Sequence, residues 1–171
     1  VSIQSDPGEG TSFSISLPLT LAVVEGMVIK VAGQTMVVPI SAIQETLRPD
    51  PGAIQTIGAG GQVLRNRNNL VPIIDLGSFF GFRAPPARID DRVLLMIETD
   101  NHQLFALVVD EIQDQRQVVI KSLETNYQRV GGVAAATILG DGRIALIIDP
   151  DRIVGTQSMR GLADLTLQAA E

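Results

Sequence analysis

The sequence predicts an all-β fold made of two small β-barrels that are built alike. Hydrophobic residues make up 45% of the 171 residues and aromatic residues only 4%, so the core must be aliphatic, and β-branched residues favour strands. Short segments along the chain alternate apolar and polar residues with a period of two, which is typical of strands with one buried face. The second half of the chain also repeats landmarks of the first half.

Residues 1–17 predict a β-hairpin. Turn-forming residues at 6–10 separate an alternating start from a second run, in which Phe13, Ile15 and Leu17 alternate with serines. Pro18 is expected to end the second strand, because proline cannot donate to a strand ladder. One face of this hairpin is apolar, so we expect something else to cover it.

The first barrel is expected to begin near Val23 and to close with a short helical turn over residues 75–80. Its strands are expected at residues 23–31, 35–40, 42–47, 63–64 and 70–74. Ala32-Gly33 supplies the first turn, and an Asn-rich tip joins the last two strands.

The second barrel is expected to follow residues 81–91, whose Pro85-Pro86 pair makes them the only linker-like segment inside the chain. Its strands are expected at residues 92–98, 104–109, 131–139 and 143–148. The Asp-Gly pair at 141–142 is a strong hairpin signal. Asp149-Pro150 suits the start of a helix, and the tail could form one weak amphipathic helix.

The two halves resemble each other at two landmarks. Residues 36–45 can be laid over 105–114, and residues 73–75 over 147–149. A single small barrel buries little surface, so packing two together stabilises both. The cleft between them is a natural binding site.

Composition excludes several classes of function. The formal net charge is -6, and the arginines are scattered, which argues against nucleic acid as a partner. The chain has no cysteine and one histidine, so we expect neither disulfides nor a metal site. No apolar run approaches the roughly 18–20 residues of a membrane-spanning helix, and no signal peptide is recognisable at the start.

Catalytic residues are not expected. His102 lies in a turn without an evident partner, and no base accompanies the serines and threonines. Asp75 and Asp149 each follow a strand and could pair as acid and base, but capping a helix is the expected role of each. The Gly-x-Gly before Thr11 precedes a strand rather than a helix, so it is expected to be a plain turn and not a phosphate site.

Residues 7–22 carry a Gly-x-Gly-Thr-x-Phe-x-x-x-Leu-Pro pattern. It resembles the last hairpin of the ATPase domain in chemotaxis histidine kinases of the CheA type, at its junction with the regulatory domain. In that family the threonine matching Thr11 lies near the adenine pocket, but the other nucleotide-binding boxes are absent here. The resemblance implies that Thr11 is at most a remnant of an ATP site. No cofactor is expected for this chain, and ATP is expected for the parent kinase.

The remainder is similar to the CheW-like regulatory domain of those kinases. The resemblance rests on residues 38–40, 61–65, 70–76, 108–112, 117–123 and 136–149. It implies two intertwined five-stranded SH3-like β-barrels (the CheW-like fold) with short helices. It also implies three parts: the end of the ATPase domain at 1–18, the CheW-like domain at 19–153 and a tail at 154–171.

What the resemblance implies for function is docking rather than catalysis. The expected partners are a CheW-type adaptor, the cytoplasmic tip of chemoreceptors and the rest of the kinase, with no nucleic acid and no membrane insertion. Receptor state would thereby change kinase autophosphorylation in a two-component phosphorelay, in the cytoplasm at membrane receptor arrays. The alternatives are a stand-alone CheW-type adaptor, a generic β interaction module and an enzyme of the β-barrel or ATPase type.

Docking residues are expected at equivalent strand ends of the two halves. Ile43 and Glu45, and likewise Ile112 and Asp114, are expected to line the cleft or an end of a barrel. The alternative is that both isoleucines are core residues. Further candidates are Leu64, Val118 and Val119, because an apolar-rich acidic domain must bury or use its surplus apolar surface.

Overall fold

Strands dominate the computed structural model, which confirms the all-β prediction. The structure describes residues 2–6, 8, 10–15, 23–57, 61–67, 69–86, 88–89, 91–120 and 130–157. Within these residues the helical elements are short. They are η1 (Ile40–Ala42), η2 (Pro51–Ala53), α1 (Leu76–Phe79) and a helix that covers residues 150–157.

The expected N-terminal hairpin is present as β1 (Ser2–Asp6) and β2 (Gly10–Ser14), paired antiparallel with Ile3 opposite Phe13. These two strands form a sheet of their own and pair with neither of the larger sheets. The predicted strand end at Leu17 and Pro18 lies outside the described residues.

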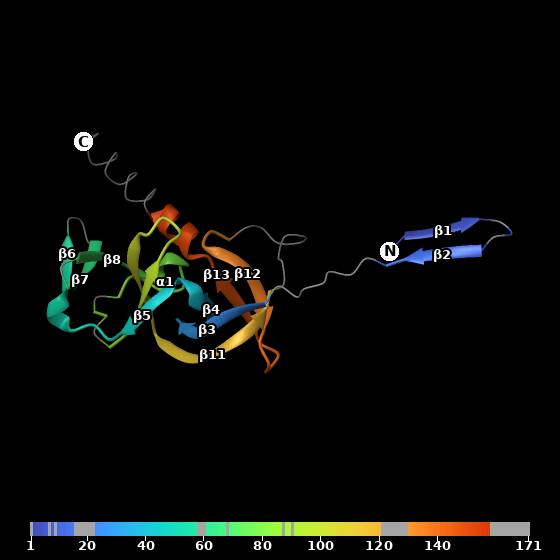
Figure 1. Ribbon diagram of the computed structural model, residues 1–171. Coiled ribbons are helices and arrows are strands. Elements are labelled where there is room, and N and C mark those ends of the chain that lie inside the picture. The colour runs from blue at the N-terminus through green and yellow to red at the C-terminus, as the bar shows by residue number, and fades with distance from the viewer. Residues whose placement is uncertain are drawn as a thin grey trace, which may run out of the picture.

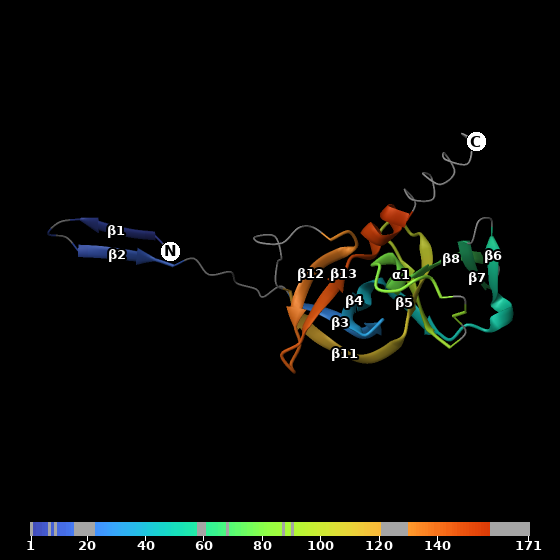
Figure 2. The ribbon, with the colours of Figure 1, turned by 180° about the vertical axis from the view of Figure 1, so that it is seen from behind.

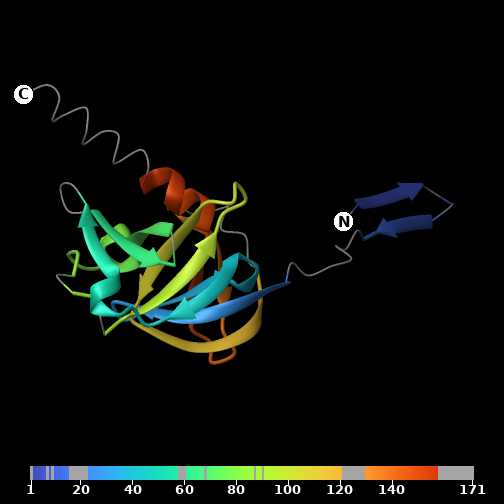
Figure 3. The ribbon, with the colours of Figure 1, turned by 60° about the vertical axis from the view of Figure 1, so that its left-hand side comes forward.

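The first large sheet has six strands in the order β5-β9-β10-β8-β7-β6 (Figure 3). Their bounds are β5 Ile43–Leu47, β6 Ile54–Ile57, β7 Gly61–Asn66, β8 Asn69–Asp75, β9 Val93–Glu98 and β10 Leu104–Val109. The sixth strand is β6, an edge strand of four residues that the sequence pattern did not indicate.

The second large sheet has five strands in the order β11-β3-β4-β13-β12 and lies beside the first (Figures 1 and 2). Their bounds are β3 Val23–Val31, β4 Gln34–Pro39, β11 Glu111–Val119, β12 Val133–Ile138 and β13 Ile144–Ile148. Its two edge strands, β11 and β12, also contact each other.

The two halves of the chain are intertwined, because each large sheet takes strands from both. Strand β4 pairs parallel with β13, with Val37 opposite Ile147, and β8 pairs parallel with β10, with Ile73 opposite Ala106. The sequence overlay matches Val37 with Ala106 and Ile73 with Ile147. The two parallel pairings are therefore the same contact made twice, with the halves exchanged, and this supports the predicted repeat.

The same symmetry places a β-bulge in each half. The register shifts between Ile43 and Glu45 where β5 pairs with β9, and between Ile112 and Asp114 where β11 pairs with β3. The extra residues are therefore Gln44 and Gln113, which the overlay also matches. A bulge bends its strand and changes the direction of neighbouring side chains, so the matched motif marks a bend in both edge strands.

Aliphatic side chains fill three clusters. The largest lies between the two large sheets and combines β3 and β4 residues such as Ile29 and Met36 with β9 and β10 residues such as Ile97 and Leu107. A second cluster belongs to the five-stranded sheet and a third to the six-stranded sheet. The central cluster makes the two sheets one packed unit.

The segment between α1 and β9 is anchored, although its proline pair suggested a linker. Ile89 is 1% exposed and packs in the cluster of the six-stranded sheet. Arg83 and Arg92, near the two ends of this segment, both bind Asp110. We call residues 83–92 the strap.

Candidate functional site

A cleft of about 490 Å³ opens between the two large sheets. One wall consists of residues 46–48, at the end of β5 and just after it, together with Asp91 and Val93. The other wall consists of residues 110–112, just before β11 and at its start. We call this hollow the inter-sheet cleft. Both β5 and β11 are edge strands of their sheets, so the cleft lies where two strand edges approach each other.

The lining of the inter-sheet cleft combines apolar and charged groups. Leu47, Val93 and Ile112 are half-buried, whereas the side chains of Asp91 and Glu111 are 82% and 61% exposed. The other lining residues, Thr46, Arg48 and Asp110, are polar or charged as well, so three apolar side chains lie within a mostly polar lining. Protein docking sites combine an apolar centre with a polar rim. The cleft is therefore suited to a partner that offers apolar side chains with polar groups around them.

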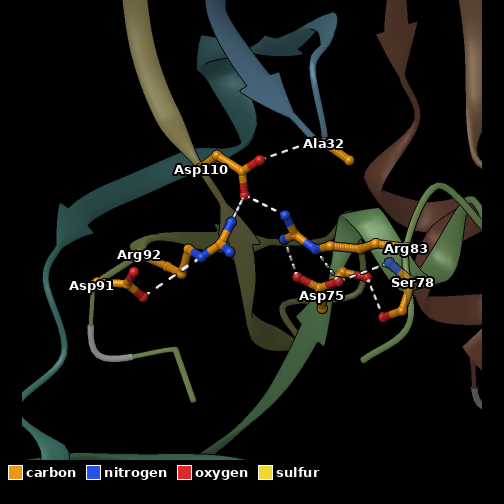
Figure 4. A network of polar contacts seen from close by, with 7 residues as sticks. All are labelled: Ala32, Asp75, Ser78, Arg83, Asp91, Arg92 and Asp110. Carbon is orange, nitrogen blue, oxygen red and sulfur yellow. Dashed lines mark hydrogen bonds and ion pairs between the residues drawn. The ribbon is translucent and has the colours of Figure 1, made fainter. Parts of the chain in front are cut away.

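A network of charged side chains lies at one end of this cleft, and Figure 4 shows Asp110 at its centre. The Asp110 Oδ1 atom accepts hydrogen bonds from Arg83 Nη1, at 2.5 Å, and from Arg92 Nη1. Its Oδ2 atom accepts from the backbone N–H of Ala32, at 2.7 Å. One carboxylate thus joins the β3–β4 turn, both ends of the strap and the start of β11.

Asp75 holds the other side of Arg83. Its carboxylate accepts from Arg83 Nη2 at 2.5 Å and from Nε at 3.2 Å, and it also accepts from the backbone N–H of Ser78 at 2.7 Å. The predicted role of Asp75 as a helix cap is confirmed by this last contact. Gly77 leaves room for the arginine, because a Cβ atom there would lie 2.5 Å from Arg83 Nε.

The network changes the acidity of its members. The hydrogen bond to Asp75 is the largest cause that raises the pKa of the Arg83 guanidinium above its ordinary value, and the bond to Asp110 adds to it. Burial raises the pKa of the Asp110 carboxyl, but the bonds from Arg83 and Ala32 lower it by more, so its pKa lies below the usual value. Both groups are therefore charged at neutral pH.

A second hollow of about 390 Å³ lies on the six-stranded sheet alone. Its polar side chains bind one another: Asn66 Nδ2 donates to Glu45 Oε1 at 3.0 Å, and Gln44 Nε2 donates to Glu98 Oε2 at 2.5 Å. His102 Nδ1 lies 2.5 Å from the other Glu98 oxygen. Because these groups are satisfied internally, this hollow is the weaker candidate.

The candidate docking residues do not gather in one place. Ile43 and Ile112 are half-buried against the central cluster, as the core alternative expected, and Ile112 also lines the inter-sheet cleft. Glu45 lines the second hollow instead. Asp114 is exposed, and a hydrogen bond from Arg116 lowers its pKa.

Two of the apolar candidates are core residues. Leu64 is 2% exposed and Val118 is 4% exposed, each inside a cluster of its own sheet, so neither side chain is available to a partner. Each has an apolar neighbour in the sequence, Val63 and Val119, so the sequence does not show which face of the strand is covered. Val119, the next residue, is 40% exposed and lies opposite Val23.

Another exposed apolar pair was missed by the sequence analysis. Ile138 and Ile144 lie opposite each other on β12 and β13 and are 51% and 71% exposed. They lie on either side of the Gly-Asp-Gly turn. Two apolar residues near the tip of a predicted hairpin are a sequence feature that could have indicated exposed apolar surface there.

The remaining predictions concern catalysis, nucleotide binding and metal binding. Asp149 accepts from the backbone N–H of Arg152 at 3.2 Å and so caps the helix over residues 150–157, as expected. Asp75 and Asp149 thus each serve a helix of their own. Thr11 is exposed on β2 and exchanges a hydrogen bond of 2.9 Å with Ser5. Among the described residues, His, Asp and Glu do not gather into a group of three that could hold a metal ion.

Comparison with known proteins adds the family context. A model of the CheW-like domain matches residues 25–158. The protein "Chemotaxis protein CheA" of Cereibacter sphaeroides is 64% identical over 154 residues, which are 90% of this chain and 22% of that protein. Its namesake in Rhizobium meliloti is 49% identical over 171 residues, 99% of this chain and 23% of that protein. The chain thus spans less than a quarter of these relatives.

The fold also has a counterpart among solved structures. The scaffolding protein TtCheW from Thermoanaerobacter tengcongensis superimposes with a TM-score of 0.59 at 18% identity, over 74% of this chain and 88% of that one. In the part of the chain that the structure describes, no helix has the length and apolarity to cross a membrane.

Proposed function

The chain belongs to the CheW-like domain family, and we propose from this that it is the regulatory scaffold domain of a CheA-type chemotaxis histidine kinase. The observation that carries the proposal is the family match over residues 25–158 together with 64% identity to a CheA protein. A role in chemotaxis signalling follows from the family. The kinase activity, its ATP and its phosphorelay belong to the parent protein.

The proposed division of the chain follows the resemblance. Residues 1–18 are the last hairpin of the ATPase domain, residues 19–153 the CheW-like domain, and residues 154–171 a tail. The separate pairing of β1 with β2 supports a hairpin that belongs to a different domain. Thr11 is then a remnant of the ATP site and has no task in this chain.

The first proposed partner is the cytoplasmic tip of a chemoreceptor, which binds in the inter-sheet cleft. The tip is expected to be a helical coiled coil, and a helix that docks in a groove presents a stripe of apolar side chains. Leu47, Val93 and Ile112 would receive such a stripe. The exposed Asp91 and Glu111 favour basic groups beside this stripe, and the exposed Arg48 favours an acidic group.

The second proposed partner is a CheW-type adaptor, which binds at exposed apolar pairs of the five-stranded sheet. Ile138 with Ile144, and Val23 with Val119, are directly opposed pairs that a monomeric domain leaves in water. Such pairs are the surplus apolar surface that an interface buries. When both surfaces are occupied, a change in the receptor alters the position of this domain, and this position controls autophosphorylation of the parent kinase.

Titration calorimetry with the two partners tests this proposal. Micromolar binding, equivalent to about -8 kcal/mol, is expected for the adaptor and for a soluble coiled-coil fragment of the receptor tip, both from the same cell. Ile144→Asp should abolish adaptor binding, whereas Ile57→Asp, at a similarly exposed isoleucine of β6, should not. Thr46→Arg, on the cleft wall, should abolish receptor-tip binding, whereas Thr56→Arg on β6 should not.

These variants are preferable to changes at Ile43 and Ile112. Both isoleucines pack against the central cluster, so a charge there would unfold the domain and leave the docking question open. If neither partner binds the folded chain, the chemotaxis assignment of these surfaces is overturned and the generic β interaction module remains.

A stand-alone adaptor is the second candidate function, and the likeness to TtCheW in fold favours it. The identity to CheA proteins and the N-terminal hairpin favour the kinase domain instead. Expressing the whole gene separates the two candidates. A product that joins this chain to an ATP-dependent kinase segment supports the kinase domain, and a product without such a segment supports the adaptor.

A further inference from the structure

The Asp110 network sits between the two walls of the inter-sheet cleft and belongs to both. Arg92 immediately precedes β9, whose partner strand β5 forms one wall. Asp110 immediately precedes β11, which forms the other wall. Asp110 also directly follows β10, whose Val109 pairs with Val93 of β9, so the backbone already joins the walls at this corner of the cleft. The ion pair between Arg92 Nη1 and Asp110 Oδ1 adds a side-chain link at the same corner, where the chain turns from β10 into the β11 wall.

Two further contacts fix Asp110 itself. Its backbone N–H donates to Lys30 O at 2.9 Å, and its Oδ2 atom holds the N–H of Ala32, a residue with a φ of 49° in the β3–β4 turn. Arg83 supplies the third side and is itself held by both oxygens of Asp75. The side chains of Arg83, Arg92 and Asp110 are only 17% to 25% exposed, so water screens these pairs less than it screens surface pairs.

From this geometry we infer that Asp110 is a positioning residue for the cleft: through Arg92 and Arg83 it sets the distance between the β5–β9 wall and the β11 wall. The inference deepens the proposed function and rests on the cleft as the receptor-tip site. A cleft whose walls are held at a fixed distance loses less conformational freedom on binding, which favours affinity. Asp110 acts by holding the walls, whether or not the partner touches it.

The wall distance can be measured directly, because the chain contains no cysteine. Spin labels on the pair Arg48→Cys and Glu111→Cys report the distance across the cleft from two exposed positions on opposite walls. Labelled protein with Asp110 intact should give one narrow distance distribution by pulsed electron paramagnetic resonance. Adding Asp110→Asn should broaden it and should weaken receptor-tip binding, measured without labels, at least tenfold.

Two further variants serve as a second test and as a control. Gly77→Ala keeps every charge but displaces Arg83, so it should shift both readouts in the same direction by less, and it decides the matter if Asp110→Asn does not fold. Asp141→Asn removes an equally direct carboxylate–arginine pair, with Arg143 at 2.6 Å, from an exposed turn outside the cleft, and should change neither readout.

The possible outcomes separate the inference from the function on which it rests. An unchanged distance distribution in folded Asp110→Asn overturns the inference, and so does a broadened distribution with unchanged affinity. Absence of receptor-tip binding by the unsubstituted chain overturns the proposed receptor-tip site, on which the inference rests. In that case the distance measurement still decides whether Asp110 sets the separation of the walls.

Discussion

Arg83 Nη1 and Asp110 Oδ1 lie 2.5 Å apart and join residues that are 27 positions apart in the sequence. Arg83 belongs to the strap that leads from the first half of the chain to the second. Asp110 lies where the chain passes from the six-stranded to the five-stranded sheet. The pair thus adds a charged link beside the central cluster, to which the neighbouring Val109 belongs.

Arg83→Ala should destabilise the protein by about 2 to 3 kcal/mol, because it leaves the partly buried carboxylates of Asp75 and Asp110 short of a charged partner. Urea unfolding followed by circular dichroism measures this change. Arg143→Ala, which removes an exposed partner of Asp141, is the control and should cause no measurable change. Equal losses in the two variants would contradict a special role for Arg83.

Asp110 should make stability depend on pH in the acid range. Its folded-state pKa lies below the value of about 3.9 found in unfolded chains, so its contribution is complete above that value and is lost as pH falls through the folded pKa. The stability difference between the unsubstituted chain and Asp110→Asn should therefore be constant from neutral pH to about 5 and shrink below about 4. Urea titrations at a series of pH values measure it, and a pH-independent difference would contradict the assignment.

The strands that sequence analysis found are those in which an apolar-rich run borders a turn signal. The hairpins around Ala32-Gly33 and Asp141-Gly142 have both features, and the capping residues Asp75 and Asp149 could be read because a polar residue follows an apolar strand. The repeat was visible because apolar positions recur in the same order in both halves, and the structure places a bulge at the same matched residues of each half.

The parts that could not be predicted depend on contacts distant in sequence. Strand β11 is mostly polar and takes its shape from pairing with β3, which lies more than 80 residues earlier. The strap looked like a linker because the role of Arg83 depends on Asp110, which no local pattern reveals. Val118 is buried because it packs in the cluster of the five-stranded sheet, whereas the next residue, Val119, is exposed. The sequence does not show which of the two faces of β11 is covered.

The N-terminal hairpin should contribute surface rather than stability. Ile3, Phe13 and Ile15 are 64% to 66% exposed, and a two-stranded hairpin alone is marginally stable. Removing residues 1–15 should leave the urea unfolding transition of the remainder unchanged and reduce binding of a hydrophobic dye. Phe13→Ser in the intact chain is the matched variant and should reduce dye binding in part. A loss of stability on truncation would show that the hairpin packs against a larger sheet.

Thr137→Val should stabilise the protein by about 1 kcal/mol, because the Thr137 side chain is 1% exposed and its hydroxyl has no hydrogen-bond partner among the described residues. Valine has the same shape without the unpaired oxygen. The matched control is Thr99→Val, at a threonine that is 6% exposed but whose hydroxyl accepts from Gln103 N at 3.0 Å. That change should destabilise by about 1 kcal/mol. Urea unfolding of both variants measures the opposite signs, and destabilisation by Thr137→Val would mean that its hydroxyl does have a partner.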